Sequence, residues 1–222
     1  TDDTYDVASA VAEQDPRIRI IRQPNGGIAN ALNAGLRGLA DDIEYIARMD
    51  GDDIMLPGRI ASQVDYLDKH TEISVVTGRV KIGCLGGQLE QDGMVRYVQW
   101  LNSHSSAEDF ARSMFIESPV CHPAAMIRRK ALEDAGGYHD MAWTEDYDLW
   151  MRLHLAGHRF GIIDQDVVIW RDHVDRVTRT NPKCAPEIFY ELKAHFLAML
   201  TTDVRIWNAG RDGKRLARSL AT

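Results

Sequence analysis

Along the first seventy residues, the spacing of hydrophobic positions changes back and forth between the pattern of a strand and the pattern of a helix. Apolar and charged side chains alternate over 17–22, as in a strand, and the glycine-containing break at 24–27 follows. Helical spacing then takes over, with apolar residues at Ile28, Leu32, Leu36 and Leu39. An apolar run at 43–49 predicts the next strand, and a helix should begin near Pro57, with Ile60, Val64 and Leu67 on its apolar face. Strands that alternate with helices predict an α/β fold with a mainly parallel sheet.

The rest of the chain continues this alternation with one interruption. A glycine-rich stretch, 83–93, leads into 94–98 and predicts a hairpin or small antiparallel excursion. Thr144 is the expected N-cap of a later helix that carries Glu145 and Asp146 in its first turn. We also expect strands at 74–82 and within 160–170, an extended segment at 122–128, and helices at 110–115, 131–135, 144–157 and 186–200.

Composition narrows the functional classes. The chain has 222 residues, 45% hydrophobic and 27% charged, which is typical of an ordinary globular protein of one large or two small domains. A formal charge of −7 argues against a nucleic-acid binder, and the basic cluster Arg211, Lys214, Arg215 and Arg218 is explained as a solvated helix face. The three cysteines form no CxxC pair, which favours a reducing, cytoplasmic setting.

Membrane insertion is not expected from the hydrophobic pattern. No apolar run approaches the ~18 residues that a spanning helix needs, and no charged and apolar leader opens the chain. Peripheral contact with the inner face of a membrane stays open.

The acidic turn Asp50-Gly51-Asp52-Asp53 is the strongest chemical signal. It places three carboxylates directly after the strand at 43–49. Ligands of parallel sheets bind at the carboxyl ends of strands, and clustered carboxylates suit a hard cation. A solvated acidic turn is the alternative, because Asp and Gly are ordinary turn residues.

The order of several motifs resembles the family 2 glycosyltransferases. The resemblance extends over about residues 1 to 180 and rests on Asn25-Gly26-Gly27 with the segment 31–35, on 49–53 with Leu56-Pro57, on His122-Pro123, and on 144–153. It implies a GT-A fold, a Rossmann-like sheet flanked by helices. It also implies an inverting transfer from a nucleotide-diphosphate sugar, with a UDP-sugar favoured, to a polysaccharide, lipid-linked or other cell-envelope acceptor.

The resemblance assigns roles to the two acidic motifs. Asp50 and Asp52 match the family's DxD motif, which holds Mg²⁺ or Mn²⁺ against the donor diphosphate. A divalent cation stabilises the negative charge that gathers on a departing diphosphate. Asp146 matches the family's general base, which takes the proton of the attacking hydroxyl, and Glu145 lies beside it in the substrate site.

Several further positions match with alternatives left open. Asn25, Gly26 and Asn33 fall where the family approaches the nucleotide, or they serve helix capping and tight packing. His122 faces a sugar or is a buried, hydrogen-bonded histidine. His173, as a metal ligand, and Arg176, as a phosphate ligand, fall in a segment that resembles the family's lid, or they are incidental surface charges.

The ends of the chain depart from the family pattern. The family's first strand and helix do not precede Thr1, so the predicted GT-A domain, 1–180, is expected to be N-terminally incomplete. A helix or linker should follow at 181–202. Residues 203–222 suggest a strand, a glycine turn and a helix, the possible start of an appended Rossmann-like segment, but the degraded glycine fingerprint does not predict NAD binding.

Four other functions compete with this interpretation. An EF-hand would want a ligand where Ile54 lies and Glu where Ala61 lies. A glycoside hydrolase could use Asp52 and Asp146, but it would not need a diphosphate-binding turn. A sugar-nucleotide nucleotidyltransferase shares the fold type and the need for metal. A catalytically silent sugar-nucleotide binder or truncated regulatory protein is the non-enzymatic alternative.

Overall fold

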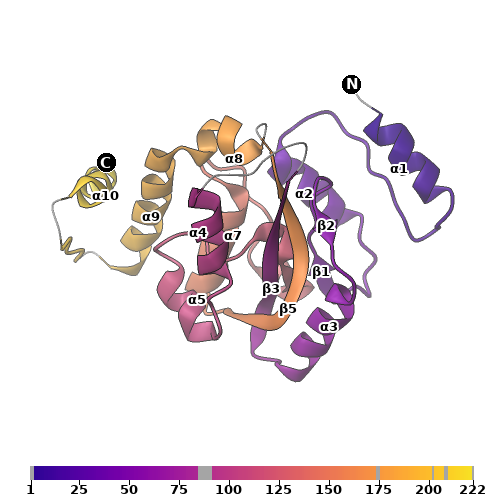
Figure 1. The fold of residues 1–222 in the computed structure, drawn as a ribbon. Helices are drawn as coiled ribbons and strands as arrows, with labels where there is room; N and C mark the ends of the chain where they lie inside the picture. The colour runs from indigo at the N-terminus through magenta and orange to yellow at the C-terminus, as the bar shows by residue number, and fades with distance from the viewer. Residues whose placement is uncertain (1–2, 85–91, 174–175, 202, 208–209, 222) are drawn as a thin grey trace.

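The computed structural model describes residues 3–84, 92–173, 176–201, 203–207 and 210–221 (Figure 1). Within these residues the sheet has the order β1-β4-β3-β5-β2. Its strands are β1 (Tyr45–Ala47), β2 (Ile54–Met55), β3 (Ile73–Cys84), β4 (Met126–Arg128) and β5 (Arg159–Asp172). The longest ladder, β3 with β5, is parallel, and the three shorter pairings are antiparallel. The predicted α/β class is confirmed, with a mixed sheet.

Helices flank this sheet on both sides (Figure 1). α3 packs against β3 and β5, α4 packs against β3, and α5 packs against β5. α1 and α10 lie at opposite ends of the view. The helices are α1 (Thr4–Ala12), α2 (Ile28–Arg37), α3 (Arg59–Lys69), α4 (Asp92–Leu101), α5 (Ala107–Ser113), α6 (Arg129–Asp134), α7 (Glu145–Leu155), α8 (Val177–Thr180), α9 (Pro186–Leu200) and α10 (Arg211–Leu220), with 3₁₀ turns η1 (His122–Ala124) and η2 (Pro182–Cys184).

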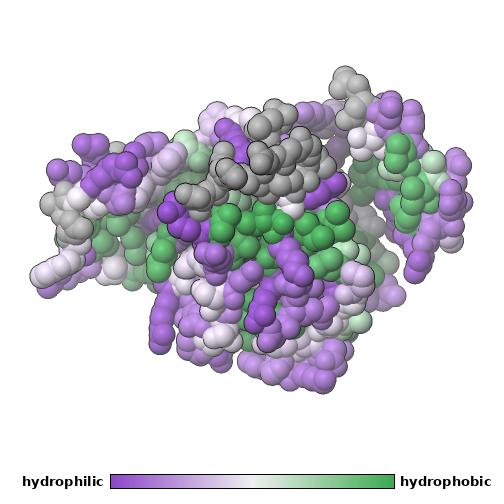
Figure 2. All heavy atoms as spheres, in the orientation of Figure 1, coloured by the Kyte–Doolittle hydropathy of each residue, from purple (hydrophilic) through white to green (hydrophobic). Residues whose placement is uncertain are grey.

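The sheet divides the core into two clusters. Successive residues of a strand point to opposite faces, so Val75 joins the cluster that contains Trp150, and Val76 joins the cluster that contains Leu67. The first cluster surrounds α7, whose side chains Tyr147, Leu149, Trp150, Met151 and Leu153 are buried. An apolar band also crosses the middle of the face shown in Figure 2. Burial on nearly all sides of α7 fixes the helix that begins with Glu145.

Three predicted strands are wrong. Residues 17–22 form no strand, and Ile18, Ile20 and Ile21 are exposed, because an alternating segment needs a neighbouring strand to bond its backbone. Residues 94–98 belong to helix α4, on which Val98 and Leu101 are buried at helical spacing, and not to a hairpin. Residues 203–207 also form no strand, although the helix expected after them is present as α10.

Other predicted elements are confirmed with changed bounds. The extended segment expected at 122–128 is strand only in β4, because η1 occupies its first half. Thr144 is the N-cap residue of α7, as predicted. The glycine-rich stretch at 83–93 falls mostly outside the described residues. α2, α3, α6 and α9 match the helices that the apolar spacing predicts.

Candidate active site

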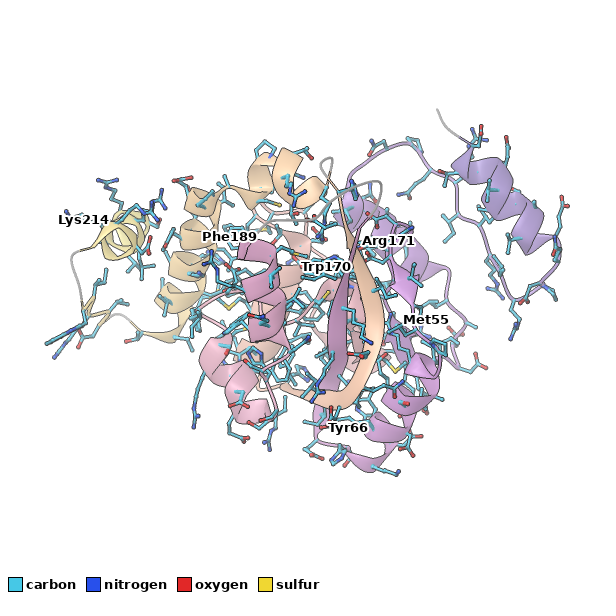
Figure 3. The ribbon with its side chains drawn as sticks, viewed as in Figure 1. Met55, Tyr66, Trp170, Arg171, Phe189 and Lys214 are labelled. Carbon is cyan, nitrogen blue, oxygen red and sulfur yellow. The ribbon has the colours of Figure 1, made fainter. Side chains whose placement is uncertain are left out.

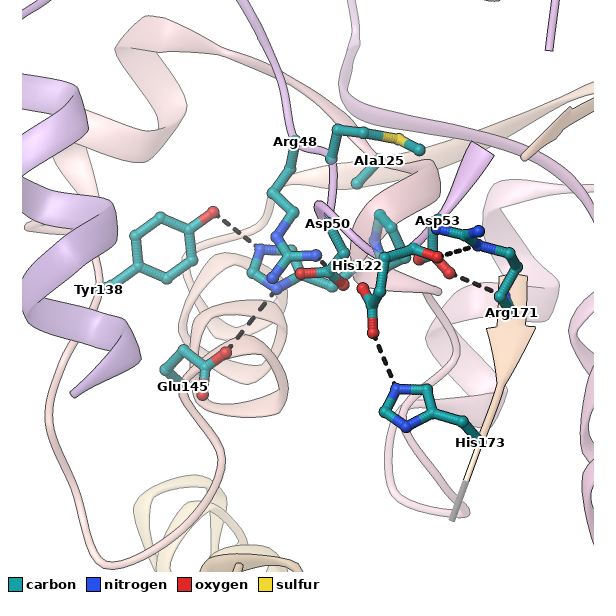
Figure 4. Close-up of polar contacts among 12 residues, drawn as sticks. Arg48, Asp50, Asp53, His122, Ala125, Tyr138, Glu145, Arg171 and His173 are labelled. Carbon is teal, nitrogen blue, oxygen red and sulfur yellow. Dashed lines mark hydrogen bonds and ion pairs between the residues drawn. The ribbon is translucent and has the colours of Figure 1, made fainter. Parts of the chain in front are cut away.

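The acidic turn follows β1, and the end of β5 lies beside it. Carboxylate oxygens of Asp50, Asp52 and Asp53 all lie within 4.8 Å of one another. The backbone N–H of Arg171 donates to Asp53 Oδ1 at 2.8 Å, and His173 Nε2 lies 3.1 Å from Asp52 Oδ2 (Figure 4). The structure therefore brings His173 to the predicted metal turn across more than a hundred residues of sequence.

The chemistry of this donor set fits a divalent cation. Burial, with repulsion from Asp50 and Asp52, raises the pKa of Asp53 to about 6, against the lowering effect of the Arg171 hydrogen bond. Asp53 Oδ2 is buried and has no hydrogen-bond partner among the described residues. Carboxylate oxygens are the ligands that hard cations take, and a cation here would relieve both the repulsion and the missing partner.

Arg48 is a site residue that the sequence did not indicate. Its side chain is only 8% exposed and forms an ion pair with Asp50 (Figure 4). Asp146 also attracts the guanidinium, so this cation lies between the two acidic motifs. In the sequence Arg48 is one charged position in the apolar run 43–49, and no local signal separates it from a solvated strand residue.

Glu145 and Asp146 begin α7 and line the same cleft as Asp50 and Asp52. Asp146 Oδ1 accepts the N–H of Tyr147 at 2.7 Å. Burial raises the pKa of Asp146, and burial together with the neighbouring Asp146 charge raises the pKa of Glu145 to about 7. A carboxyl with a raised pKa suits proton transfer near neutral pH.

His122 connects Glu145 with the loop before α7. Its Nε2 lies 2.9 Å from the Tyr138 hydroxyl, and its Nδ1 lies 3.8 Å from Glu145 Oε1 (Figure 4). Burial, followed by the nearby charge of Arg48, holds the pKa of His122 well below its usual value. The ring is therefore neutral, so one of its nitrogens donates a hydrogen bond and the other accepts one.

Most of the predicted site residues line one cleft of about 670 Å³: Asp50, Asp52, His122, Glu145, Asp146 and Arg176. Arg176 packs its guanidinium 4.2 Å from the centre of the Trp170 ring and lies 3.7 Å from Asp172. In Figure 3, Trp170 lies on β5 and Phe189 on α9, and both residues line this cleft. The two acidic motifs, which are separate in sequence, therefore share one solvent-accessible space.

Asn25, Gly26 and Asn33 are not among the residues that line this cleft, although the neighbouring Gly27 and Ile28 line it. Asn33 is bonded on both sides to the backbone of Tyr138, donating to its carbonyl at 2.7 Å and accepting from its N–H at 3.0 Å. Asn25 accepts the N–H of Gly27 at 3.1 Å, and Gly26 is exposed. The polar groups of Asn33 hold the loop before α7, which is the packing alternative, whereas direct ligand contact by the three residues stays a prediction.

A buried arginine, Arg59, connects the backbone before the acidic turn with the backbone around His122. It is 1% exposed and donates to the carbonyls of Arg48 at 2.9 Å, Pro123 at 2.6 Å and Ala125 at 3.1 Å. Gln63 accepts from Arg59 Nε at 2.9 Å and itself donates to the Ala124 carbonyl at 2.8 Å. These bonds tie the strand before the acidic turn to the turn that carries His122.

Comparison with known proteins identifies the family. The model for the family described as "Glycosyl transferase family 2" matches residues 1–136, well over half of the chain. The chain belongs to glycosyl transferase family 2. Among its relatives, the amylovoran biosynthesis glycosyltransferase AmsE of Erwinia amylovora is 32% identical over 152 residues, which cover 68% of this chain and 53% of AmsE. The glycosyltransferase chain described here thus spans about half the length of such a relative.

Solved structures of low sequence identity show the same fold. S. aureus TarS 1–349, in complex with UDP-GlcNAc, superposes with a TM-score of 0.65 at 17% identity, covering 99% of this chain and 60% of that one. The mannosyltransferase PcManGT of Pyrobaculum calidifontis, in complex with GDP-Man and Mn²⁺, gives 0.52 at 19% identity, covering 100% and 57%. The expected GT-A fold is confirmed.

Within the parts of the chain that the structure describes, no helix combines the length and apolar character that crossing a membrane requires.

Proposed function

We propose that this glycosyltransferase is metal-dependent and inverting, and that it transfers a sugar from a nucleotide-diphosphate donor to a saccharide or lipid-linked acceptor. The observation that carries the proposal is the shared cleft, which both the carboxylate turn and Asp146 line. The turn suits a metal-bound diphosphate, and Asp146 suits a base beside an attacking hydroxyl. A single displacement between them inverts the anomeric configuration.

The residues of the turn would hold the cation. Asp50 and Asp52, with Asp53 and His173 beside them, are the candidate ligands, and Mg²⁺ or Mn²⁺ would neutralise charge on the leaving diphosphate. Arg48 orients Asp50 through their ion pair. Arg176, which lines the same cleft, supplies a cation for phosphate oxygens.

Asp146 would take the proton of the acceptor hydroxyl. Burial raises its pKa, which makes the carboxylate a stronger base, while the attraction of Arg48 opposes that rise. Glu145 and His122 bracket the same space with hydrogen-bonding groups. The chain's own residues therefore provide a base, an orienting network and a cation-binding turn.

Donor and acceptor classes follow from the relatives. TarS binds UDP-GlcNAc and PcManGT binds GDP-Man with Mn²⁺ in their structures, so a nucleotide-diphosphate sugar, with a UDP-sugar favoured, is the proposed donor. AmsE acts in amylovoran biosynthesis, which supports a polysaccharide of the cell envelope as the acceptor class.

The test uses the full-length protein with Mn²⁺ and a panel of sugar nucleotides that includes UDP-GlcNAc and GDP-Man. We expect release of nucleotide from at least one donor, and its loss in EDTA. Folded protein that binds donor without any metal-dependent release would contradict the proposed activity and favour a silent sugar-nucleotide binder. Formation of a sugar nucleotide from a sugar phosphate and a nucleoside triphosphate would favour a nucleotidyltransferase.

A further inference from the structure

Tyr138, in the loop before α7, is a buried residue to which the chemistry proposed above assigns no part. It is 4% exposed and does not belong to the described residues that line the cleft. Its hydroxyl nevertheless lies 2.9 Å from Nε2 of His122, which does line the cleft. Any effect of Tyr138 on bound substrates must therefore pass through a neighbour, and His122 is the neighbour to which its hydroxyl is bonded.

The loop that carries Tyr138 is fixed by two helices. Asn33 of α2 bonds the N–H and the carbonyl of Tyr138, at 3.0 and 2.7 Å. Arg152 of α7 donates to the Gly137 carbonyl at 2.9 Å, and the buried Asp148 accepts from Arg152 Nε at 2.7 Å. Gly137 has a φ of +73°, and a Cβ there would lie 2.8 Å from Asn33 Oδ1, so this position requires glycine. The phenol is thus placed before any ligand arrives.

The imidazole of His122 is held with one nitrogen toward Tyr138 and the other toward Glu145. His122 is 5% exposed, and its ring meets the fully buried ring of Trp150 edge-on, with 5.7 Å between the centroids and 87° between the planes. Nε2 faces the Tyr138 hydroxyl, and Nδ1 lies 3.8 Å from Glu145 Oε1 (Figure 4). Close packing against Trp150 and Tyr138 opposes a rotation that would exchange the two nitrogens.

The direction of these contacts follows from charge. A neutral imidazole has one N–H and one bare nitrogen, and an ionised carboxylate only accepts hydrogen bonds. A bare Nδ1 would set its lone pair against the Glu145 carboxylate, whereas an Nδ1–H group is attracted to it. Nε2 is then bare, and the Tyr138 hydroxyl, which keeps its proton because burial raises its pKa, can donate to it. The guanidinium of Arg48, which also acts on this ring, is engaged by its ion pair with Asp50.

We propose that Tyr138 is a positioning residue, whose hydroxyl donates to Nε2 of His122 and so fixes the tautomer that turns an Nδ1–H group toward Glu145. The partner of one ring nitrogen commonly sets the state of the other. The inference rests on the proposed function and goes beyond it, because it gives a direction to the contacts behind the proposed base. An N–H aimed at Glu145 offsets the repulsion between this carboxylate and that of Asp146. The reverse tautomer would add repulsion at the helix start that carries the base.

The first experiment records the tautomer of His122 directly. The full-length protein is prepared with isotope-labelled histidine, without metal or donor, and two-bond hydrogen–nitrogen NMR spectra distinguish a protonated from a bare ring nitrogen. His122→Gln assigns the ring by the loss of its signals, and the contact of the ring with Trp150 assigns it independently. At pH 8.5, above the pKa of about 7 for Glu145, we expect a protonated Nδ1 and a bare Nε2.

The second experiment removes the hydroxyl and keeps the ring. In Tyr138→Phe the Nε2–H form should increase at the expense of the Nδ1–H form. Turnover with Mn²⁺ and the active donor should fall about tenfold, the upper range for one neutral hydrogen bond, while the KM of the donor stays within about twofold. Tyr5→Phe removes the same group from a tyrosine that is 46% exposed on α1, and it should change neither the tautomer nor turnover. Circular dichroism confirms that each variant is folded at the assay temperature.

Three results would overturn the inference. An Nε2–H tautomer in the parent contradicts the direction of the contacts. An unchanged tautomer in Tyr138→Phe, or unchanged turnover despite a changed tautomer, contradicts the positioning role. If the parent releases no nucleotide from any donor, the proposed function fails instead. The tautomer spectra still decide the hydrogen-bond chain in that case, because they need neither metal nor donor.

Discussion

The two acidic motifs that line the cleft differ in the surroundings of their carboxylates. At the acidic turn, the side chain of Asp52 is 46% exposed, and cationic or hydrogen-bonding groups from Arg48, Arg171 and His173 surround the turn. At the start of α7, Asp146 and Glu145 are more buried, lie beside each other, and have raised pKa values. Asp50 and Asp52, the more open carboxylates of the turn, suit exchange of a metal and diphosphate, whereas the more desolvated carboxyls of Glu145 and Asp146 suit proton transfer.

The largest effect is expected from a substitution of Asp146, which leaves the acidic turn intact. Asp146→Asn should lower turnover about a thousandfold, which is the scale of general base catalysis, while donor affinity in Mn²⁺ changes little. Steady-state kinetics and donor titration calorimetry measure the two quantities. Asp134→Asn, on the surface of α6, is the control, and turnover that stays within tenfold of the parent would reject Asp146 as the base.

Removing Arg59, which joins the strand before the acidic turn to the turn that carries His122, should have the next largest effect. Arg59→Lys replaces a planar guanidinium that reaches the carbonyls of Arg48, Pro123 and Ala125 together with one ammonium that cannot bond all three, so the free energy of unfolding should fall by about 3 kcal/mol. Urea denaturation measures this change. Mn²⁺ affinity and turnover should fall together at a temperature where the variant is folded. The exposed substitution Arg37→Lys should change none of them, and an Arg59→Lys protein of parental stability would contradict the role.

A third substitution separates metal binding from base catalysis. Asp52→Ala removes one carboxylate and the partner of His173, so donor binding should weaken about thirtyfold in Mn²⁺ and remain unchanged in EDTA. Titration of donor under both conditions measures the difference, with the α3 surface variant Asp65→Ala as control. An equal dependence on metal in parent and variant would remove Asp52 from the metal site.

The smallest expected effect reports the raised pKa at the buried end. Glu145 has a folded-state pKa of about 7 against an ordinary 4.5, so its ionisation costs stability as pH rises through that interval. At pH 8 the free energy of unfolding of Glu145→Gln, measured by urea denaturation, should therefore exceed that of the parent by on the order of 1 kcal/mol. At pH 4 this gain should be absent.

Loss of the Glu145 contact with His122 works in the opposite direction at all pH values, which makes the pH dependence the informative quantity. Glu13→Gln, at an exposed position after α1, is the control. A stability difference that does not change between pH 4 and pH 8 would show that Glu145 is not destabilised by ionisation.

Local patterns predicted well where tertiary contacts agreed with them. The helical spacing of α2, α3 and α9 and the N-cap at Thr144 are confirmed, because each apolar stripe has a surface to cover. The same method failed at 17–22, whose alternating isoleucines find no neighbouring strand. It failed again at 94–98, where the glycine-rich stretch before these residues indicated a hairpin but burial of one helical face decided for α4.

The site divides along the same line. Asp50, Asp52 and Asp146 could be named from the sequence because each lies in a short motif. Arg48 and Arg59 could not be, because Arg48 acts between Asp50 and the distant Asp146, and Arg59 bonds the carbonyls of Pro123 and Ala125. The role of Asn33 as a clamp on the Tyr138 backbone likewise depends on a contact over 105 residues.

The sequence by itself determined the family, the α/β class and the two acidic motifs, since these depend on order and local spacing. Only the tertiary structure decided that both motifs line one cleft and that Arg48 lies between them. It also decided that the carboxyls of Glu145 and Asp146 are desolvated. The physical reason is that charge, burial and hydrogen bonding are properties of neighbours in space, which a linear order of residues does not record.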